Sequence, residues 1–205
     1  MNRALIQVQK QLANNFEFEG EEYVDMYFDQ ALARFRNCLS RFNNNKYLND
    51  DFHLNTDFYA VFLYYFANTI YRNIGRSEVC NALYALNKML HSVEAYYEVE
   101  LPDYFRLGHP LGTVLGRAQY SNYFSVSQNC TVGNNKGIYP KIGEHVSMLM
   151  NSSILGDSTI GSNCIVSANC SIIDQNIPDN SIVFGKSPDL IIKNNKTTRF
   201  KDKWL

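Results

Sequence analysis

The chain has 205 residues, 45% of them hydrophobic, and its 19 basic and 20 acidic residues leave a formal net charge of −1. This length and hydrophobic fraction allow one domain, or two small ones, with a substantial core. The balanced charge leaves no basic surplus for nucleic acid. The purely apolar stretches are too short for a membrane span, and the first residues lack a signal-peptide core, so we expect a cytoplasmic protein. The five cysteines show no metal-binding spacing, and we expect buried thiols and no metal site.

The first part of the chain has the spacing of amphipathic helices. From Glu21 to Phe42 apolar residues recur every three or four positions, and Asn43–Asn45 ends this helix. A second helix is predicted from Thr56, a plausible N-cap, to about Gly75. A third follows Ser77, and its side chains expected to point inward are Val79, Leu83, Leu86 and Leu90. Residues 92–101 alternate between apolar and polar, which predicts a strand.

A six-residue repeat then takes over. Large, mostly aliphatic residues recur at Val114, Tyr120, Val126, Val132, Ile142, Met148, Ile154, Ile160, Val166 and Ile172. Four residues after each of these leaders the side chain is mostly small, as at Ala118, Cys130, Ser152, Ser158, Cys164 and Cys170, with Phe124 and Val146 as exceptions. Large and small residues in fixed phase suit a narrow prism in which three short strands make one coil. The prediction is an α+β chain, with a helical domain followed by a left-handed parallel β-helix.

One interval in the repeat is irregular. Val132 and Ile142 are ten residues apart, four more than the period, so residues 133–140 must form a loop outside the coils. Such loops on repeat folds often carry function. We therefore divide the chain into a helical domain at 1–91, a β-helix domain at 92–192 with its loop at 133–140, and a tail at 193–205.

Several passages of the chain, over roughly residues 56–192, resemble the serine acetyltransferases of the hexapeptide acyltransferase superfamily. The matching passages are His109–Gly116 (HPLGTVLG), Gln128–Gly133 (QNCTVG), Tyr139–Gly143 (YPKIG), Ile154–Gly156 and Ile182–Pro188. The resemblance implies acyl transfer from acetyl-CoA without a metal. It also implies a homotrimer with active sites between neighbouring prisms, with a dimer of such trimers through the N-terminal helices as the alternative assembly.

The resemblance assigns roles to individual residues. His109 matches the family's catalytic histidine, and histidine suits a general base because it titrates near neutrality. The groove that holds the pantetheine arm of coenzyme A would be lined by Gly133, Asn134, Met150, Asn151, Ser167 and Ala168. Candidates for binding the nucleotide phosphates are Lys141, Lys186 and Lys193, although each of them is also an ordinary surface lysine.

Three departures from the family concern the acceptor. Gly108 stands where the family has an aspartate that holds serine, Ile138 replaces an arginine that grips the substrate carboxylate, and Tyr139 replaces a second histidine. A free amino acid would lose its charged partners at such a site. We therefore expect an O-acetyltransferase acting on a sugar or glycan hydroxyl. The alternatives are N-acetylation of an amino sugar, a non-catalytic scaffold derived from the family, and serine acetylation through a rearranged site.

Overall fold

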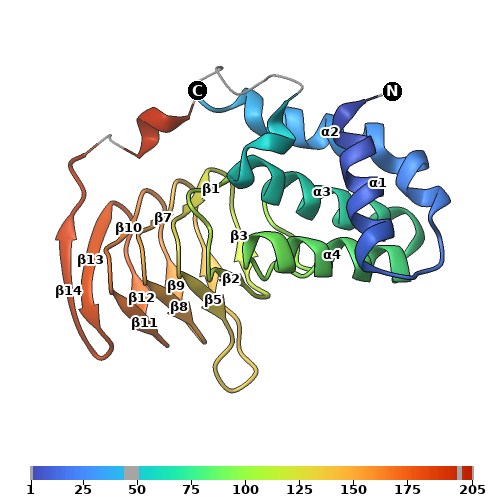
Figure 1. Ribbon diagram of the computed structural model, residues 1–205. Coiled ribbons are helices and arrows are strands. Elements are labelled where there is room, and N and C mark those ends of the chain that lie inside the picture. Colours follow the sequence, from blue (N-terminus) through green and yellow to red (C-terminus); the bar gives the residue numbers. More distant parts are fainter. Residues whose placement is uncertain (1, 44–50, 198–199, 205) are drawn as a thin grey trace.

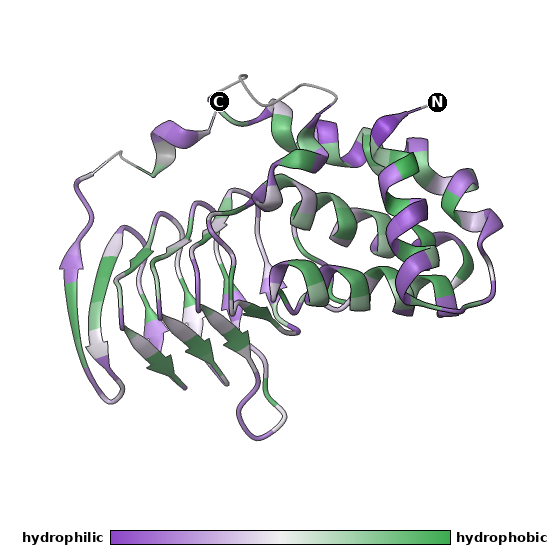
Figure 2. Cartoon of the chain, in the orientation of Figure 1, coloured by the Kyte–Doolittle hydropathy of each residue, from purple (hydrophilic) through white to green (hydrophobic). Residues whose placement is uncertain are grey.

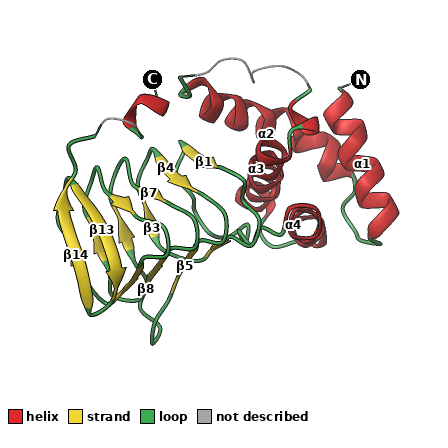
Figure 3. Cartoon of the chain, turned by 60° about the vertical axis from the view of Figure 1, so that its left-hand side comes forward, coloured by secondary structure: helices red, strands yellow, loops and turns green. Residues whose placement is uncertain are grey.

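The computed structural model describes residues 2–43, 51–197 and 200–204. Helices occupy the N-terminal part and short strands the C-terminal part, side by side along one axis (Figures 1 and 3). The helices are α1 (Arg3–Asn15), α2 (Glu22–Ser40), α3 (Thr56–Ile74) and α4 (Glu78–His91), and two 3₁₀ turns lie at Phe52–Leu54 and Lys201–Lys203. The predicted break at Asn43–Asn45 lies mostly outside the described residues. The expected α+β fold class is confirmed.

Helix α3 is the centre of the helical part. Every residue from Phe58 to Ile70 is buried, because α3 packs against α2, α4 and the first strand at once. The apolar faces turn inward along all four helices (Figure 2). Two details differ from the sequence prediction. The N-cap is Asn55, whose side chain accepts from the N–H groups of Asp57 and Phe58, and not Thr56. Leu90, expected to point inward, is 40% exposed.

Residues 92–101 do not form the predicted strand. Their side chains alternate in burial as the pattern requires: Val93, Ala95, Tyr97 and Val99 are buried, and the residues between them are half-buried. The backbone pairs only at Glu94, which makes an isolated bridge to Val114. The alternation therefore comes from an extended segment that lies between the helices and the first coil. Its carbonyls are bound by side chains, since Tyr64 Oη donates to Val99 O and Asn68 Nδ2 donates to Tyr97 O.

The C-terminal part is a parallel β-solenoid with three faces. The first face contains β1 (Phe105–Leu107), β4 (Phe124–Val126), β7 (Ser147–Met148), β10 (Ile165–Val166) and the start of β13 (Ser181–Lys186). The second contains β2 (Val114–Leu115), β5 (Thr131–Gly133), β8 (Ser153–Leu155), β11 (Ser171–Ile173) and the end of β13. The third contains β3 (Gln119–Tyr120), β6 (Lys141–Ile142), β9 (Thr159–Ile160) and β12 (Asn176–Ile177).

The strand register confirms the six-residue repeat and its interruption. Ser153 lies beside Ser171, 18 residues further along, so one coil holds three repeats. Thr131 lies beside Ser153, 22 residues further along, and the same 22-residue step separates Gln119 from Lys141. The four additional residues are taken up between β5 and β6, where Asn135 and Ile138 pair across a hairpin. Before the loop the phase shifts by one residue: Val114 lies beside Thr131 and Leu115 beside Val132, so the buried residue of that repeat is Leu115 and not the predicted leader Val114.

From Val126 onward the interior of the solenoid is filled as the repeat predicts, whereas the first two leaders, Val114 and Tyr120, are only half-buried. The leaders from Val126 to Ile172 are buried, and so are the small residues that follow Val126 and later leaders. The corners turn through residues with positive φ, mostly asparagines, at Asn129, Asn151, Asn163, Asn169 and Asn180. Gly116 is required for another reason: a Cβ there would lie 2.7 Å from the carbonyl oxygen of Val132 in the next coil. All five cysteines are buried and free, as expected.

An antiparallel strand closes the solenoid. Strand β14 (Asp189–Asn194) runs back along the whole length of β13. The chain then returns toward the helices (Figure 1), where Trp204 bridges to Phe42 with ring centroids 5.0 Å apart. Residues 198, 199 and 205 of the tail lie outside the described residues.

Candidate functional site

His109 lies on the turn between β1 and β2, at the end of the solenoid nearest the helices. Its backbone has φ of 51°, a left-handed conformation uncommon for histidine, and its side chain is 85% exposed. The turn is held by the N–H of Leu111, which donates to the carbonyl of His109 at 2.8 Å. An exposed imidazole on a fixed turn is free to meet a substrate.

A carboxylate from the helical part reaches this turn. Oδ2 of Asp57 accepts from the backbone N–H of His109 at 3.1 Å and lies 3.9 Å from Nδ1 of the same histidine. Asp57 stands in the first turn of α3, two residues after the cap at Asn55. Sequence reasoning missed it, because 52 residues separate it from His109 and it belongs to none of the matching passages.

Asp57 and His109 line a pocket of about 170 Å³ between the helices and the first coil. The other lining residues are Thr56, Leu90, His91, Pro110 and Leu111. His91 is buried, faces Asn87 Oδ1 at 2.8 Å, and packs edge-on against Tyr59. Burial lowers the pKa of His91 to about 4, so its ring is neutral at pH 7. Among these described lining residues the only charged group at neutral pH, apart from any charge on His109, is the Asp57 carboxylate.

Four of the expected donor-binding residues lie along the same edge of the solenoid as His109. We call this edge the His109 corner: the turns between the first and second faces, at residues 108–113, 127–130, 149–152 and 167–170. Backbone hydrogen bonds link successive turns, from Asn129 N to Leu111 O, from Asn151 N to Gln128 O and from Asn169 N to Met150 O. The residues placed here by the structure are Met150, Asn151, Ser167 and Ala168.

The remaining expected residues lie on the opposite edge of the second face. Gly133 ends β5, Asn134 begins the extended loop, Ile138 and Tyr139 close it, and Lys141 starts β6. The loop is tied to later coils, because Asn135 Nδ2 donates to Asp174 Oδ2 at 2.7 Å. Ile138 and Tyr139 are 49% and 40% exposed and point away from the solenoid core. One chain therefore does not bring Tyr139 and Ile138 to His109.

The last candidates are two lysines and Gly108, and Lys186 pairs with Ser171 directly after the last turn of the His109 corner. Lys186 and Lys193 are exposed on the closing hairpin, in β13 and β14. Gly108 stands beside His109, and its N–H donates to Val126 O. A Cβ at Gly108 would meet only that oxygen, at 3.8 Å, so the space there admits a side chain.

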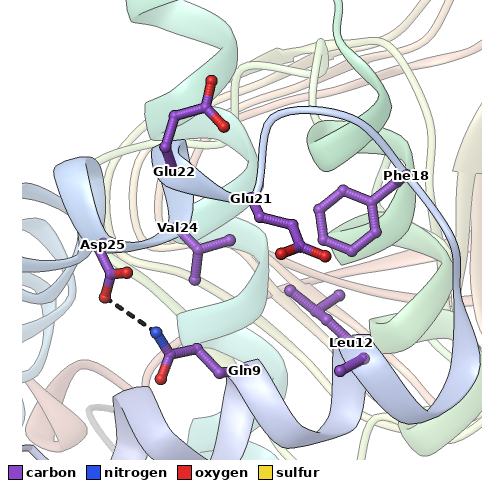
Figure 4. Close-up of a pocket in the computed structure, with 8 residues that line it drawn as sticks. Gln9, Leu12, Phe18, Glu21, Glu22, Val24 and Asp25 are labelled. Carbon is purple, nitrogen blue, oxygen red and sulfur yellow. Dashed lines mark hydrogen bonds between the residues drawn. The ribbon is translucent and has the colours of Figure 1, made fainter.

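A second pocket, of about 370 Å³, lies between α1 and α2 (Figure 4). Leu12, Phe18 and Val24 form its apolar side, and the carboxylates of Glu21, Glu22 and Asp25 surround it. Gln9 donates to Asp25 there at 2.9 Å. Its lining includes no histidine and no residue of the solenoid, so the candidate site remains at His109.

No group of three or more His, Cys, Asp or Glu side chains within residues 2–43, 51–197 and 200–204 is arranged to hold a metal ion. In the same part of the chain, no helix combines the length and the hydropathy needed to cross a bilayer.

Comparison with known protein families finds the same six-residue repeat that the strand register of the solenoid shows. Residues 139–174 match the family model "Bacterial transferase hexapeptide (six repeats)". This segment of the chain therefore carries hexapeptide repeats. No curated protein sequence matches the chain.

Solved structures match this chain over most of its length. Serine acetyltransferase from Neisseria gonorrhoeae matches with a TM-score of 0.70 and 22% identity, over 88% of this chain and 73% of the other. Isoform 3 from Entamoeba histolytica, in complex with cysteine, matches with a TM-score of 0.64 and 20% identity, over 93% and 73%. A serine acetyltransferase in complex with CoA matches with a TM-score of 0.68 and 16% identity, over 84% and 75%. These likenesses establish a shared fold.

Proposed function

We propose that this protein is an acetyl-CoA-dependent O-acetyltransferase whose acceptor is a sugar or glycan hydroxyl. The observation that carries the proposal is the position of His109: an exposed imidazole on a rigid turn, with a carboxylate beside Nδ1. With Nδ1 turned to Asp57, Nε2 is available to the acceptor. Nε2 takes the hydroxyl proton as the oxygen attacks the thioester carbonyl. The C–S bond then breaks, and the proton passes from the imidazolium to the departing thiolate.

The donor fits the His109 corner chemically. Ser167 and Ala168 are small, and Asn151 and Ala168 are exposed, so a narrow pantetheine arm can approach the backbone along the turns. Similarity to a serine acetyltransferase solved with CoA supports this donor. Lys141, Lys186 and Lys193 are the candidate partners for its phosphates.

A homotrimer would complete this site. The loop residues Gly133, Asn134, Ile138 and Tyr139 lie on the edge of the second face opposite His109. In a trimer of parallel prisms, the loop edge of one copy faces the His109 corner of its neighbour, and Tyr139 of that copy would close the site. Doubling through the N-terminal helices is a further possibility for the assembly. The five buried thiols fit a reducing compartment, and we propose the cytoplasm.

The choice of a sugar over free serine rests on the charges near His109. No lysine or arginine is among the described residues that line its pocket, and Asp57 would repel an acceptor carboxylate. The positions that hold serine in the similar family are Gly108, Ile138 and Tyr139 here. The carboxylate also favours a second candidate, an amino sugar that presents its ammonium group to Asp57 and becomes N-acetylated after losing a proton.

The test measures acceptor-dependent thiol release from acetyl-CoA across L-serine, free sugars, amino sugars, nucleotide sugars and oligosaccharides. We expect release with a sugar and not with serine, and a loss of at least about 100-fold in His109→Ala. An ester product identifies O-acetylation and an amide identifies N-acetylation. Turnover of serine at rates comparable with the best sugar would contradict the acceptor assignment. Failure to bind coenzyme A would contradict the enzyme assignment and favour a scaffold.

A further inference from the structure

Strand β14 lies at the end of the solenoid farthest from helices α1–α4, and one of its two edges is unpaired (Figures 1 and 3). Among the described strands it pairs only with β13, in one antiparallel register over residues 189–194. We call the edge turned away from β13 the β14 edge. An unpaired edge is a template for a strand of another chain, unless its side chains oppose the pairing.

The hydrogen bonds to β13 show which residues present their backbone at the β14 edge. Asn195 N–H donates to Asn180 O at 2.7 Å, directly after β14, so this residue faces β13. Backbone groups alternate in direction along an antiparallel strand. The even-numbered residues of β14 therefore turn their N–H and C=O toward the β14 edge. The N–H of Leu190 donates to Pro188 O in its own turn at 3.1 Å, so the groups that remain there include the Leu190 carbonyl and both groups of Ile192.

The side chains of β14 place opposite charges symmetrically about Ile191. Asp189 lies two residues before it and Lys193 two residues after it, and both are exposed. All three share one face of the sheet with Phe184, which pairs with Ile191 in β13. Ile191 is 57% exposed and Phe184 is 37% exposed. This face therefore has an apolar centre with a negative charge at one end and a positive charge at the other.

We propose that the β14 edge pairs antiparallel with the β14 edge of a second copy of this chain, about a two-fold axis at Ile191. In this register Asp189 of each copy lies opposite Lys193 of the other, and the two Ile191 side chains meet at the axis. Ile192 N–H of each copy faces the Leu190 carbonyl of the other. The interface is self-complementary, as a two-fold contact requires. It involves neither the turn of His109 nor the loop at 133–140, and it goes beyond the proposed function.

Charge selects this register over two other pairings of the same strands. A parallel pairing in register places Asp189 beside Asp189 and Lys193 beside Lys193, and like charges directly opposite are destabilising. An antiparallel pairing about Ile192 places Ile191 opposite Lys193 and Asp189 opposite Asn195, so it contains no pair of opposite charges. Only the axis at Ile191 combines two attractive pairs with an apolar centre.

Cysteine cross-linking tests the register. At a non-hydrogen-bonded antiparallel pair the Cα atoms lie about 4.5 Å apart, within the range that a disulfide spans. Under mild oxidation, Ile191→Cys should therefore form a covalent dimer on a non-reducing gel. The five native thiols are buried. Asn194→Cys is the matched control, because this residue is exposed on the same strand but does not face its own copy. Cross-linking of Ile192→Cys in preference to Ile191→Cys would overturn the register.

Charge reversal tests the pairing without a covalent bond. Asp189→Lys places lysines opposite each other, and Lys193→Asp places aspartates opposite each other. Each variant alone should have a mass about twofold or more below that of the parent, measured by size exclusion with light scattering at one protein concentration. An equilibrated mixture of the two variants should recover the mass of the parent, because every opposed pair is then attractive. The double variant D189K/K193D should recover it as well.

Three results would overturn the proposal. The first is a parent mass in both single variants, and the second is an Ile191→Cys chain that cross-links no more than Asn194→Cys. The third is a loss of mass that neither the mixture nor the double variant recovers, because recovery requires the variants to be folded and correctly paired. Neither measurement involves turnover, so the inference can fail while the proposed function stands, and the reverse.

Discussion

The rings of Tyr123 and His145 lie face to face, with centroids 4.4 Å apart and planes 6° apart. Both residues have positive φ and occupy equivalent corners of successive coils, between the third and first faces. Tyr104 extends the stack on the other side of Tyr123, and the edge of Trp204 meets Tyr123 at 5.5 Å. This corner of the solenoid is therefore where the returning C-terminal segment is held.

Removing the indole of Trp204 should loosen that attachment. Trp204 is 7% exposed and packs against Phe42 of the helical part as well as Tyr123 of the solenoid. We expect Trp204→Ala to lower the free energy of unfolding by roughly 3 kcal/mol, measured by urea denaturation. Trp204→Phe should recover part of the loss. If Trp204→Ala is as stable as the parent, the segment does not contribute to the fold.

The small positions inside the solenoid should not accept large side chains. Cys164 is fully buried at one of them. We expect Cys164→Leu to destabilise the protein by about 1–3 kcal/mol through overpacking, and Cys164→Ala to have a smaller effect. Phe124 occupies the same phase two coils earlier and is also fully buried. There the opposite change, Phe124→Ala, should cost about 3–5 kcal/mol. Equal tolerance of Leu and Ala at Cys164 in chemical denaturation would contradict this description of the core.

Asparagine at a corner should be replaced better by glycine than by alanine. Asn163 has φ of 58°, and its Nδ2 donates to Asn180 Oδ1 at 2.7 Å. Both substitutions lose that bond, but alanine also carries the strain of the left-handed conformation. We expect Asn163→Gly to be more stable than Asn163→Ala by about 0.5–1 kcal/mol. At exposed Lys10 in α1 the order should reverse, because glycine is the poorer helix former by about 1 kcal/mol. The same order at both sites would contradict the strain argument.

His91 should make the stability depend on pH between about 4 and 6.5. Burial lowers the pKa of His91 from 6.5 to about 4, so in this range the unfolded chain binds a proton that the native chain does not. The contribution of neutral His91 to the free energy of unfolding is therefore fully present above pH 6.5, declines as the pH falls, and is lost below pH 4. The change is at most about 3 kcal/mol. Urea denaturation at pH 7 and pH 5 measures it, and His91→Gln should have a smaller difference between the two pH values. An equal difference in the variant would assign the dependence to other groups.

The repetitive part of the fold was predictable because its pattern is local and long. The leaders from Val126 to Ile172 are buried, and the four-residue excess before Ile142 is a loop that leaves the coils in register. The prediction of a strand at residues 92–101 was wrong. An alternation of apolar and polar residues indicates which side chains are buried, but it does not show that the backbone pairs with another strand. Asn55 was missed as a cap because Thr56 is also a good one, and only the backbone distinguishes them.

Less of the candidate site than of the fold could be predicted from the sequence. Motif matching found His109, but the carboxylate beside it comes from another element of the fold. Asp57 is one of several acidic residues in the helical part, and only the packing of α3 against the first coil places it there. Separation of the loop from His109, across the second face, likewise depends on the order of strands around the prism.

Strand β14 has a consequence for the size of the molecule. A parallel solenoid is a stack of similar coils. The strands at the edge of its last coil can pair with those of a further coil, so the repeat alone does not set where the stack ends. Here β13, the last strand of the first and second faces, pairs with a strand that runs the other way over residues 189–194, and the helices cover the opposite end through α3 and β1. On these two faces elements outside the repeat therefore lie at both ends of the stack and set the number of coils, whereas the third face ends at β12.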